Sequence, residues 1–414
     1  MALNFVWIAF FLIAFIVALI KLIFFGDTTI FTEVVNGMFD SAKTGAEISI
    51  GLVGIMTFWL GIMKVGEKAG MINLFARGVG PFFSRLFPEV PKNHPANGSV
   101  IMNFSANMLG LDNVATPVGL KAMKELQELN PVKDTASNAQ IMFLVLNTAG
   151  LTLIPTSVIA LRMANGAANP ADIFIPSLIG TFISFISGMI AVAIFQKINL
   201  FKLPILIFFG GFLSLMAGLY FWLGNMPPDQ IQVYASLIGG IIIFSIIILF
   251  IGFGAIKKIN VYEGFIDGAK EGFHTSVMII PYLIAILVAI SAFRTTGCMD
   301  YVVNAIGAVA AACGLDTAFV PALPVGLMKT LSGGGARGLM VDVMKTYGAD
   351  SFQGRLASII QGSTETTFYV LAVYFGSVDI KNSRYALICG LIADVVGLIA
   401  AIILAYIFFG HTIK

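Results

Sequence analysis

The residue types most able to do chemistry in this sequence gather in one stretch, Gln361-Gly362-Ser363-Thr364-Glu365-Thr366-Thr367-Phe368-Tyr369. It lies between the apolar runs 356–360 and 370–375, and together they are long enough to cross a bilayer. An unpaired carboxylate in mid-membrane costs about 2.5 kcal/mol or more, so such groups usually serve a function. On a helix, Gln361, Thr364 and Glu365 share one face. We therefore predict a binding site formed by Gln361, Ser363, Thr364, Glu365 and Thr366.

The alternative for this stretch is a buried polar knot that only ties helices together. One hydroxyl group would be enough for that purpose, whereas the stretch carries a carboxylate and several hydroxyls. The amount of polarity therefore favours binding.

The first half of the chain carries a comparable apolar segment with a polar centre, at 139–161. Asn147 and Thr148 lie in its middle, and Thr148 and Thr152 share a face if the segment is one helix. Pro155 removes a backbone hydrogen bond and frees carbonyl groups, which can kink the helix. Asn147 and Thr148 are therefore further candidates for binding.

Three residues are candidates for ion coupling, namely Thr152, Glu365 and Asp394. Freed carbonyls with Thr and Asn oxygens suit Na⁺, because hard cations take oxygen ligands. Glu365 can instead carry a proton. Asp394 lies in the last apolar run, where it either takes part in coupling or pairs with a neighbour. The sequence leaves Na⁺ and H⁺ open and points to no other cofactor and no metal.

The apolar segment 99–120 is interrupted by glycine and polar residues, so neither of its arms can cross a bilayer alone. We predict a re-entrant helical hairpin, which is stable at membrane depth only when buried in protein or lining a cavity. Asn103 and Asn107 point the same way from one helical arm, and Gly110 allows the tip to turn. Capping of the second arm is the alternative role of Asp112 and Asn113. The binding candidates in this segment are Asn103, Asn107, Asp112, Asn113 and Thr116.

The segment 319–344 is interrupted in the same way, at Ser332-Gly333-Gly334-Gly335-Ala336-Arg337-Gly338, and predicts a second re-entrant hairpin. Consecutive glycines allow a hinge and let backbone N–H groups approach a ligand. A helix that starts near Ala336 directs its N–H groups and positive dipole end at that ligand. Arg337 adds a charge, which favours an anionic ligand group; a salt bridge between Arg337 and Glu365 is the alternative. The binding candidates here are Ser332, Gly333, Gly334 and Arg337.

The composition predicts the class of protein. Of 414 residues, 58% are hydrophobic and 11% are charged, whereas soluble domains have about 25% charged residues. The chain is therefore an all-α polytopic membrane protein in contact with the lipid bilayer. A net charge of +2 does not suggest nucleic acid as a partner. The three cysteines and three histidines form no metal motif, and the absence of a nucleophile–base constellation argues against an enzyme.

Apolar runs of spanning length fall at 4–25, 48–64, 139–161, 173–195, 203–223, 231–254, 274–293, 355–376 and 385–409. The connector 66–98 contains Met71–Phe87, which mixes arginines with aromatic residues as an interfacial amphipathic helix does. Most Lys and Arg residues fall on one face of this arrangement, which predicts a cytoplasmic N-terminus and an outside C-terminus. The expected location is the inner (plasma) membrane.

The chain repeats itself. The pattern Asp-x-Ala-Lys-x-Gly occurs at 40–45 and at 267–272, and each copy is followed by a span, a hairpin, a polar span and a further span. The charge-based topology gives the two halves opposite orientations, as in secondary transporters with inverted repeats and a central binding site. We therefore predict a first repeat at 1–200, a linking transmembrane helix at 201–230 and a second repeat at 231–414, each repeat with one hairpin and one broken polar span.

The motifs themselves resemble a known family. Phe87–Lys92 and Asn107–Pro117 are similar to spore maturation protein A, and Leu331–Ala336 and Gln361–Gly376 to spore maturation protein B. The chain thus resembles a fusion of the two, joined near 197–205, although the usual Gly-Ser-Gly tip is here three glycines. This resemblance implies the Gate (nucleoside recognition) domain and a transporter-like core with re-entrant hairpins. It implies self-association, for which we take a dimer as the working hypothesis, and it names no substrate.

Two functions follow from these observations. The first is a secondary transporter that moves a small polar solute, anionic or nucleoside-like, coupled to Na⁺ or H⁺. The second is a membrane scaffold or channel-like component in spore maturation or envelope physiology, with a polar core and no alternating access.

Overall fold

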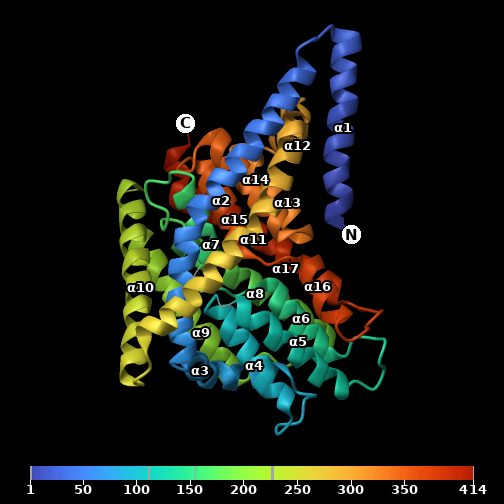
Figure 1. Ribbon diagram of the computed structural model, residues 1–414. Coiled ribbons are helices and arrows are strands. Elements are labelled where there is room, and N and C mark those ends of the chain that lie inside the picture. Colours follow the sequence, from blue (N-terminus) through green and yellow to red (C-terminus); the bar gives the residue numbers. More distant parts are fainter. Residues whose placement is uncertain (1, 111, 154, 225–227, 414) are drawn as a thin grey trace.

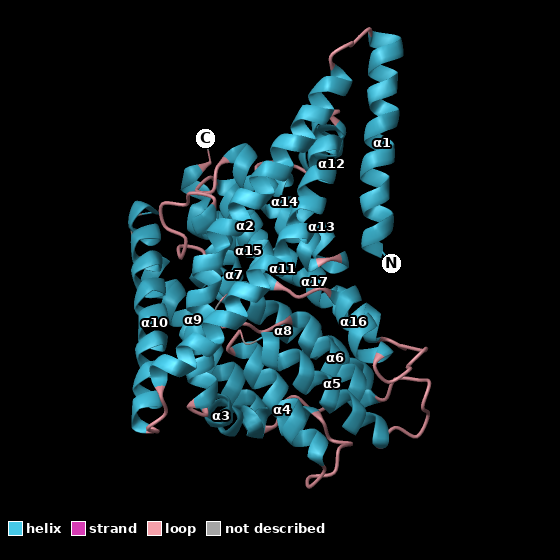
Figure 2. Cartoon of the chain, viewed as in Figure 1, coloured by secondary structure: helices cyan, strands magenta, loops and turns pink. Residues whose placement is uncertain are grey.

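The computed structural model describes residues 2–110, 112–153, 155–224 and 228–413. Throughout these residues the regular structure is helical, and the only β-type pairing is an isolated bridge between Thr135 and Asn382 (Figure 2). Six of the described helices are long and apolar enough to cross a membrane. The protein is therefore a multi-pass helical membrane protein, as the composition predicts.

The N-terminal part contains eight helices in the described residues, and two further helices follow them. They are α1 (Ala2–Phe25), α2 (Ile30–Lys68), α3 (Met71–Leu86), α4 (Pro95–Met108), α5 (Asp112–Glu128), α6 (Asn138–Ala149), α7 (Thr156–Ala164), α8 (Phe174–Gln196), α9 (Leu203–Gly224) and α10 (Pro228–Ile256).

The C-terminal part follows the same order of elements from α2 onward. Its helices are α11 (Val261–Thr295), α12 (Cys298–Ala312), α13 (Leu323–Leu331), α14 (Gly333–Tyr347), α15 (Phe352–Ser363), α16 (Thr367–Gly376) and α17 (Ala386–Phe409), with short 3₁₀ turns at Val320–Ala322 and Gly410–Thr412. The helical hairpins α4–α5 and α13–α14 correspond, as do the broken helices α6–α7 and α15–α16.

The long helices α2 and α11 pack against each other in opposite directions. Gly45 lies against Ile284 and Gly61 against Phe265, while Gly272 lies against the Met56 carbonyl. Later residues of α2 thus meet earlier residues of α11, which makes the pair antiparallel. Small residues at the contact let the two backbones approach closely.

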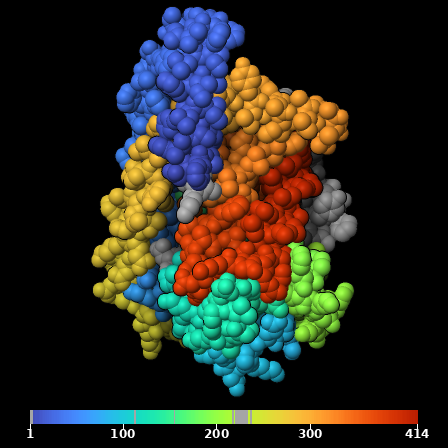
Figure 3. Space-filling view, turned by 90° about the vertical axis from the view of Figure 1, so that its right-hand side faces the viewer, coloured from blue at the N-terminus to red at the C-terminus, as the bar shows by residue number. Residues whose placement is uncertain are grey.

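Figure 1 shows the hairpins at different levels of the molecule, with α4 and α5 in the lower part and α13 and α14 above the middle. The space-filling view shows α1 at the surface above α16 (Figure 3). The indole N–H of Trp7 in α1 donates to the Ala285 carbonyl of α11 over 3.0 Å, which ties α1 to the rest.

Four helices differ from the sequence-based expectations. Helices α2 and α11 begin at Ile30 and Val261, well before the predicted spans, because their first turns are too polar for a hydropathy signal. Helix α12 lies in a stretch where the sequence predicted no element. Helix α3 has the predicted amphipathic pattern, but its apolar face is buried by protein: the Phe83 ring stacks on Phe104 at 4.3 Å between centroids.

The two polar spans are not continuous helices. Helix α6 ends at Ala149 and α7 starts at Thr156, and α15 ends at Ser363 and α16 starts at Thr367. The prediction that Thr148 and Thr152 share a helical face is therefore wrong, and so is the same prediction for Gln361, Thr364 and Glu365. Both errors have one cause: a helix periodicity was applied across a break.

Candidate functional site

The two hairpin tips and the two helix breaks meet around one cavity of about 570 Å³. Ten predicted binding or coupling residues line it: Asn107, Thr116, Asn147, Thr152, Ser332, Gly333, Gly334, Arg337, Glu365 and Thr366. The structure thus brings together residues that lie more than 200 positions apart in the sequence.

The other predicted residues do not line this cavity. Asn103 lies one turn behind Asn107, and Thr148, Gln361, Ser363, Thr364 and Asp394 are buried in the protein behind the breaks. Asp112 and Asn113 begin α5, and their side chains lie outside the described part of the structure.

The first half supplies a network of amide side chains. The Asn107 amide donates to the Asn147 Oδ1 atom over 2.8 Å, which connects the hairpin to the broken helix. Asn103 donates to the Ala115 carbonyl over 2.8 Å and so joins the two arms of the hairpin. The Tyr374 hydroxyl lies 3.5 Å from both the Asn103 Nδ2 and Asn147 Oδ1 atoms. These bonds fix the orientation of the amides.

The break between α6 and α7 is held by side-chain and backbone hydrogen bonds. Gly150 ends α6 in the left-handed conformation, with φ of 55°, which glycine adopts without strain. Its carbonyl accepts from the Thr181 hydroxyl over 2.8 Å and from the Thr152 hydroxyl over 3.2 Å. The Leu153 amide donates to the Met108 carbonyl over 2.9 Å, which ties the break to the hairpin tip.

The break between α15 and α16 pairs with the first one. Thr364 is extended, and the Glu365 amide donates to the Thr148 carbonyl over 3.0 Å. The extended backbone directs Glu365 into the cavity, where its side chain is half-exposed, while Gln361 and Thr364 stay buried. A Cβ atom on Gly150 would lie 2.5 Å from the Glu365 Cγ atom, so glycine leaves the room that Glu365 needs.

The acidic group of the site pairs with a lysine that the sequence analysis missed. The Lys329 Nζ atom lies 3.9 Å from the Glu365 Oε2 atom, and the Lys329 side chain is only 5% exposed. The predicted alternative, an Arg337–Glu365 salt bridge, is wrong. The sequence did carry a signal for this pair. Lys329 is the one charged residue in the segment 323–331, which is otherwise mostly apolar, and a charged residue there needs a partner.

Arg337 keeps its charge without an acidic partner among the described residues. Its Nε atom is buried and has no hydrogen-bond partner there. Arg337 lies in the first turns of α14, which starts at Gly333 and is capped by the Ser332 hydroxyl accepting from the Gly335 amide over 3.1 Å. The dipole of α14 adds to the positive potential at this end of the helix.

Asp394 lies outside the cavity, between α17 and the break. Its Oδ2 atom accepts from the Thr367 hydroxyl over 2.6 Å, and its Oδ1 atom is buried with no partner in the described residues. Gly390, one turn earlier, contacts Thr148 and Thr367. Asp394 thus belongs to a buried polar layer directly behind the cavity.

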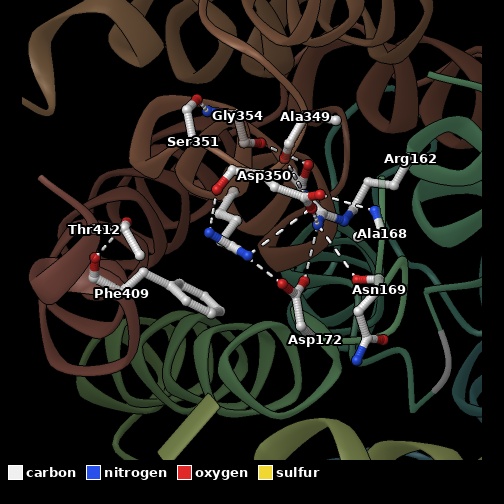
Figure 4. Close-up of polar contacts among 12 residues, drawn as sticks. Arg162, Ala168, Asn169, Asp172, Ala349, Asp350, Ser351, Gly354, Phe409 and Thr412 are labelled. Carbon is white, nitrogen blue, oxygen red and sulfur yellow. Dashed lines mark hydrogen bonds and ion pairs between the residues drawn. The ribbon is translucent and has the colours of Figure 1, made fainter. Parts of the chain in front are cut away.

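A cluster of four charged residues joins the two halves on another side of the molecule (Figure 4). Arg162 donates to Asp172 over 2.9 Å and to Asp350 over 3.1 Å, and Arg355 donates to the second oxygen of Asp172 over 2.7 Å. The Arg162 and Asp172 side chains are fully buried. From the sequence alone, Lys and Arg residues outside the predicted site indicate only membrane orientation, so this cluster was not predicted.

The halves are also joined by loop backbone. The Lys381 and Asn382 amides donate to the Asp134 carbonyl over 2.8 and 3.0 Å, and the Ala136 amide donates to the Asn382 carbonyl over 2.9 Å. Figure 1 shows the loop that follows α5 and the loop that follows α16 side by side at the right of the molecule.

The helical fold and the two-part site agree with the comparisons with known proteins. The family model described as Gate, nucleoside recognition, matches residues 49–165 and 276–381, which include both hairpins and both breaks. The chain therefore belongs to the Gate family of membrane proteins, as the sequence motifs predict.

Two relatives narrow this assignment. Spore maturation protein A of Bacillus subtilis (strain 168) is 41% identical over 187 residues, which cover 45% of this chain and 92% of the relative. Spore maturation protein B of the same organism is 46% identical over 158 residues, covering 38% of this chain and 87% of the relative. No solved structure matches the chain.

Proposed function

We propose that this protein is a secondary transporter that moves a small polar solute across the membrane, coupled to Na⁺ or H⁺. The observation that carries the proposal is the single cavity to which both hairpin tips and both helix breaks contribute. Broken helices at membrane depth are tolerated where they line a cavity, and in transporters they form the substrate site.

Inverted repeats would explain the architecture. We propose repeats at 1–200 and 231–414, linked by the helix at 201–230, with α4–α5 and α13–α14 as re-entrant hairpins. The antiparallel packing of α2 and α11 supports opposite orientations, because these helices hold corresponding places in the two halves. The different levels of the two hairpins, with α4–α5 in the lower part and α13–α14 above the middle, support it as well (Figure 1).

The charged residues of the second half suggest how solute and ion are coupled. Glu365 extends into the cavity and its carboxylate lies 3.9 Å from Lys329, so a solute group or a proton that reaches Glu365 also changes the environment of a buried ammonium group. Thr152 offers a hydroxyl for Na⁺ in the same cavity, and Asp394 offers a carboxylate behind it. We propose that coupling runs through this group of residues.

The remaining features of the transporter are also proposals. The location is the inner membrane, with the N-terminus in the cytoplasm and the C-terminus outside, and the protein associates with itself as a dimer. The excess of Lys and Arg in the loops near α3, α5 and α9 supports this orientation.

The first test is a thermal-shift screen of polar metabolites on the purified protein, with and without Na⁺. A ligand that binds the native state raises its apparent stability, by about 2.7 kcal/mol at a hundred times its Kd. A solute whose effect depends on Na⁺ or on pH supports coupled transport. No stabilising solute under any condition would contradict the proposal.

A membrane scaffold with a rigid polar core is the second candidate. The buried charged cluster around Arg162 and the backbone bonds at Asp134 favour it, because both tie the halves together. The two functions differ in whether the hairpin tip moves. A Cβ atom on Gly334 would meet only the Ser332 hydroxyl, at 3.9 Å, so a side chain can begin at this position without a clash.

Gly334→Val therefore separates the two candidates. In a transporter it should slow solute uptake about tenfold, because β-branched residues restrict the backbone of a hinge, while the thermal melting temperature stays unchanged. Uptake at the wild-type rate would show that the glycines are not a hinge. Gly240→Val on α10 is the matched control, since it also faces open space.

A further inference from the structure

A second cavity, of about 620 Å³, borders the tip of the α13–α14 hairpin, which also lines the polar cavity. Most of its wall is apolar and aromatic and comes from the three long helices α1, α2 and α11. The wall includes Trp7, Met56, Trp59, Ile279, Tyr282 and Leu283. Most of these residues lie in the two segments that match the Gate family model, but the polar site does not explain an apolar cavity at this place.

The two cavities share three residues, Ser332, Gly334 and Arg337. The first turns of α14 are therefore a border with polar space on one side and apolar space on the other. Gly334 is exposed at this border and carries no side chain, so the two spaces are separated by little more than backbone.

Arg337 places a positive charge at this border. Its Nε atom is buried without a partner in the described residues. The carboxylate that lines the polar cavity, Glu365, already pairs with Lys329. The Arg337 side chain as a whole is partly buried, and a charged group withdrawn from water is costly unless it is paired and hydrogen-bonded. An anionic ligand group would complete the pairing, and guanidinium groups match carboxylates in geometry.

We propose that the solute is an amphipathic organic acid that occupies both cavities. Its carboxylate binds Arg337 and the N-terminal turn of α14, and its apolar body lies between Trp59, Tyr282 and Ile279. Further polar groups of the solute face the amides of Asn107 and Asn147. This inference rests on the proposed transport function, since it names the class of solute for the same site.

The test measures binding of a matched series to the full-length protein in phosphatidylcholine nanodiscs, by calorimetry. The series consists of acetate, butyrate and hexanoate, with hexanol as the uncharged analogue and empty nanodiscs as the blank. Affinity should rise about fourfold for each added methylene, because each one leaves water. Hexanol should bind at least about tenfold more weakly than hexanoate, since it lacks the charge-assisted bonds.

Two variants locate the apolar and anionic parts of the ligand. Ile279→Trp fills the apolar cavity and should weaken hexanoate about tenfold while leaving acetate unchanged. Val277→Trp is its control, because Val277 lies on the same helix, is exposed and does not line the cavity. Arg337→Gln should weaken all three acids, and an unchanged melting temperature confirms that each variant is folded.

Three results would overturn the inference. Equal affinity for acetate and hexanoate would place the ligand in the polar cavity alone, and the proposed transport of a small solute would still stand. Equal affinity for hexanol and hexanoate, unaffected by Arg337→Gln, would make the apolar cavity a site for lipid chains. No binding by any acid would reject this solute class, while the metabolite screen judges transport separately.

Discussion

The two halves of the molecule use the same order of helices but supply different chemistry to the shared cavity. The first half contributes neutral groups, Asn107, Thr116, Asn147 and Thr152. The second half contributes Arg337 and Glu365, with Lys329 directly behind them. The polar break at 361–369 and the polar break at 147–155 are thus counterparts in position and not in charge.

The difference extends to how firmly each set is held. The amides of the first half bond to one another and to backbone carbonyls, from Asn103 to Ala115 and from Asn147 to Phe143. In the second half, the Glu365 carboxylate lies 3.9 Å from Lys329, and the Nε atom of Arg337 has no partner in the described residues. We infer that the first half forms a fixed wall and that the second half carries the groups that respond to solute and ion.

The largest effect is expected for Glu365→Gln. Solute uptake by proteoliposomes should fall about a hundredfold or more, since the variant loses the charge opposite Lys329 while keeping the shape of the side chain. The fold should stay intact because Glu365 is half-exposed. Glu128→Gln, at an exposed position away from the cavity, is the control and should transport normally. Normal uptake by Glu365→Gln would show that this carboxylate is not needed for transport, and the functional difference between the two halves would not hold.

The buried charged cluster tests whether the halves depend on each other for stability. Asp172→Asn leaves Arg162 and Arg355 buried with a neutral partner and should lower the free energy of unfolding by about 3 kcal/mol. Asp350→Asn is the matched control, because Asp350 is 34% exposed and its loss should cost about 1 kcal/mol. Thermal melting of the purified variants measures both, and equal losses would contradict the role given to burial.

The next largest effect, on stability, is expected at the contact between the antiparallel helices α2 and α11, which we call the seam. A Cβ atom on Gly268 would collide with the Leu60 carbonyl, so Gly268→Ala should force the helices apart and cost about 2 kcal/mol. Gly264→Ala, one turn earlier, meets only ordinary contacts and should be neutral or slightly stabilising. If both variants melt at the same temperature, the close packing of this seam is not required.

The smallest effect is expected in the first half. Asn147→Ala removes the acceptor for the Asn107 amide and should cost about 1 kcal/mol of stability. Uptake should fall only a few-fold, since no charge is lost. A loss of uptake as large as that of Glu365→Gln would show that the first half also carries coupling groups.

Much of the fold could be predicted from the sequence. Hydropathy predicts nine spans, which include the six described helices that are long and apolar enough to cross a membrane. The interruptions at 99–120 and 319–344 predict the two helical hairpins, and the motifs at 107–117 and 361–376 predict the Gate family. Polar residues within apolar runs marked most of the cavity lining, because such residues need protein or water around them. The sequence predicts a broken polar span in each half, and the structure has the breaks at Gly150 and Thr364, but helical periodicity does not hold across them and therefore gave wrong side-chain faces.

The sequence by itself determined which segments are long and apolar enough to cross a membrane and where polar residues interrupt them, because both depend on the residue types within about twenty positions. Only the tertiary structure decided which charges meet. Lys329 pairs with Glu365, and Arg162 pairs with Asp350 across 188 positions of sequence. Such pairings depend on how distant helices pack, and the composition of a segment says nothing about the partner that packing brings to it.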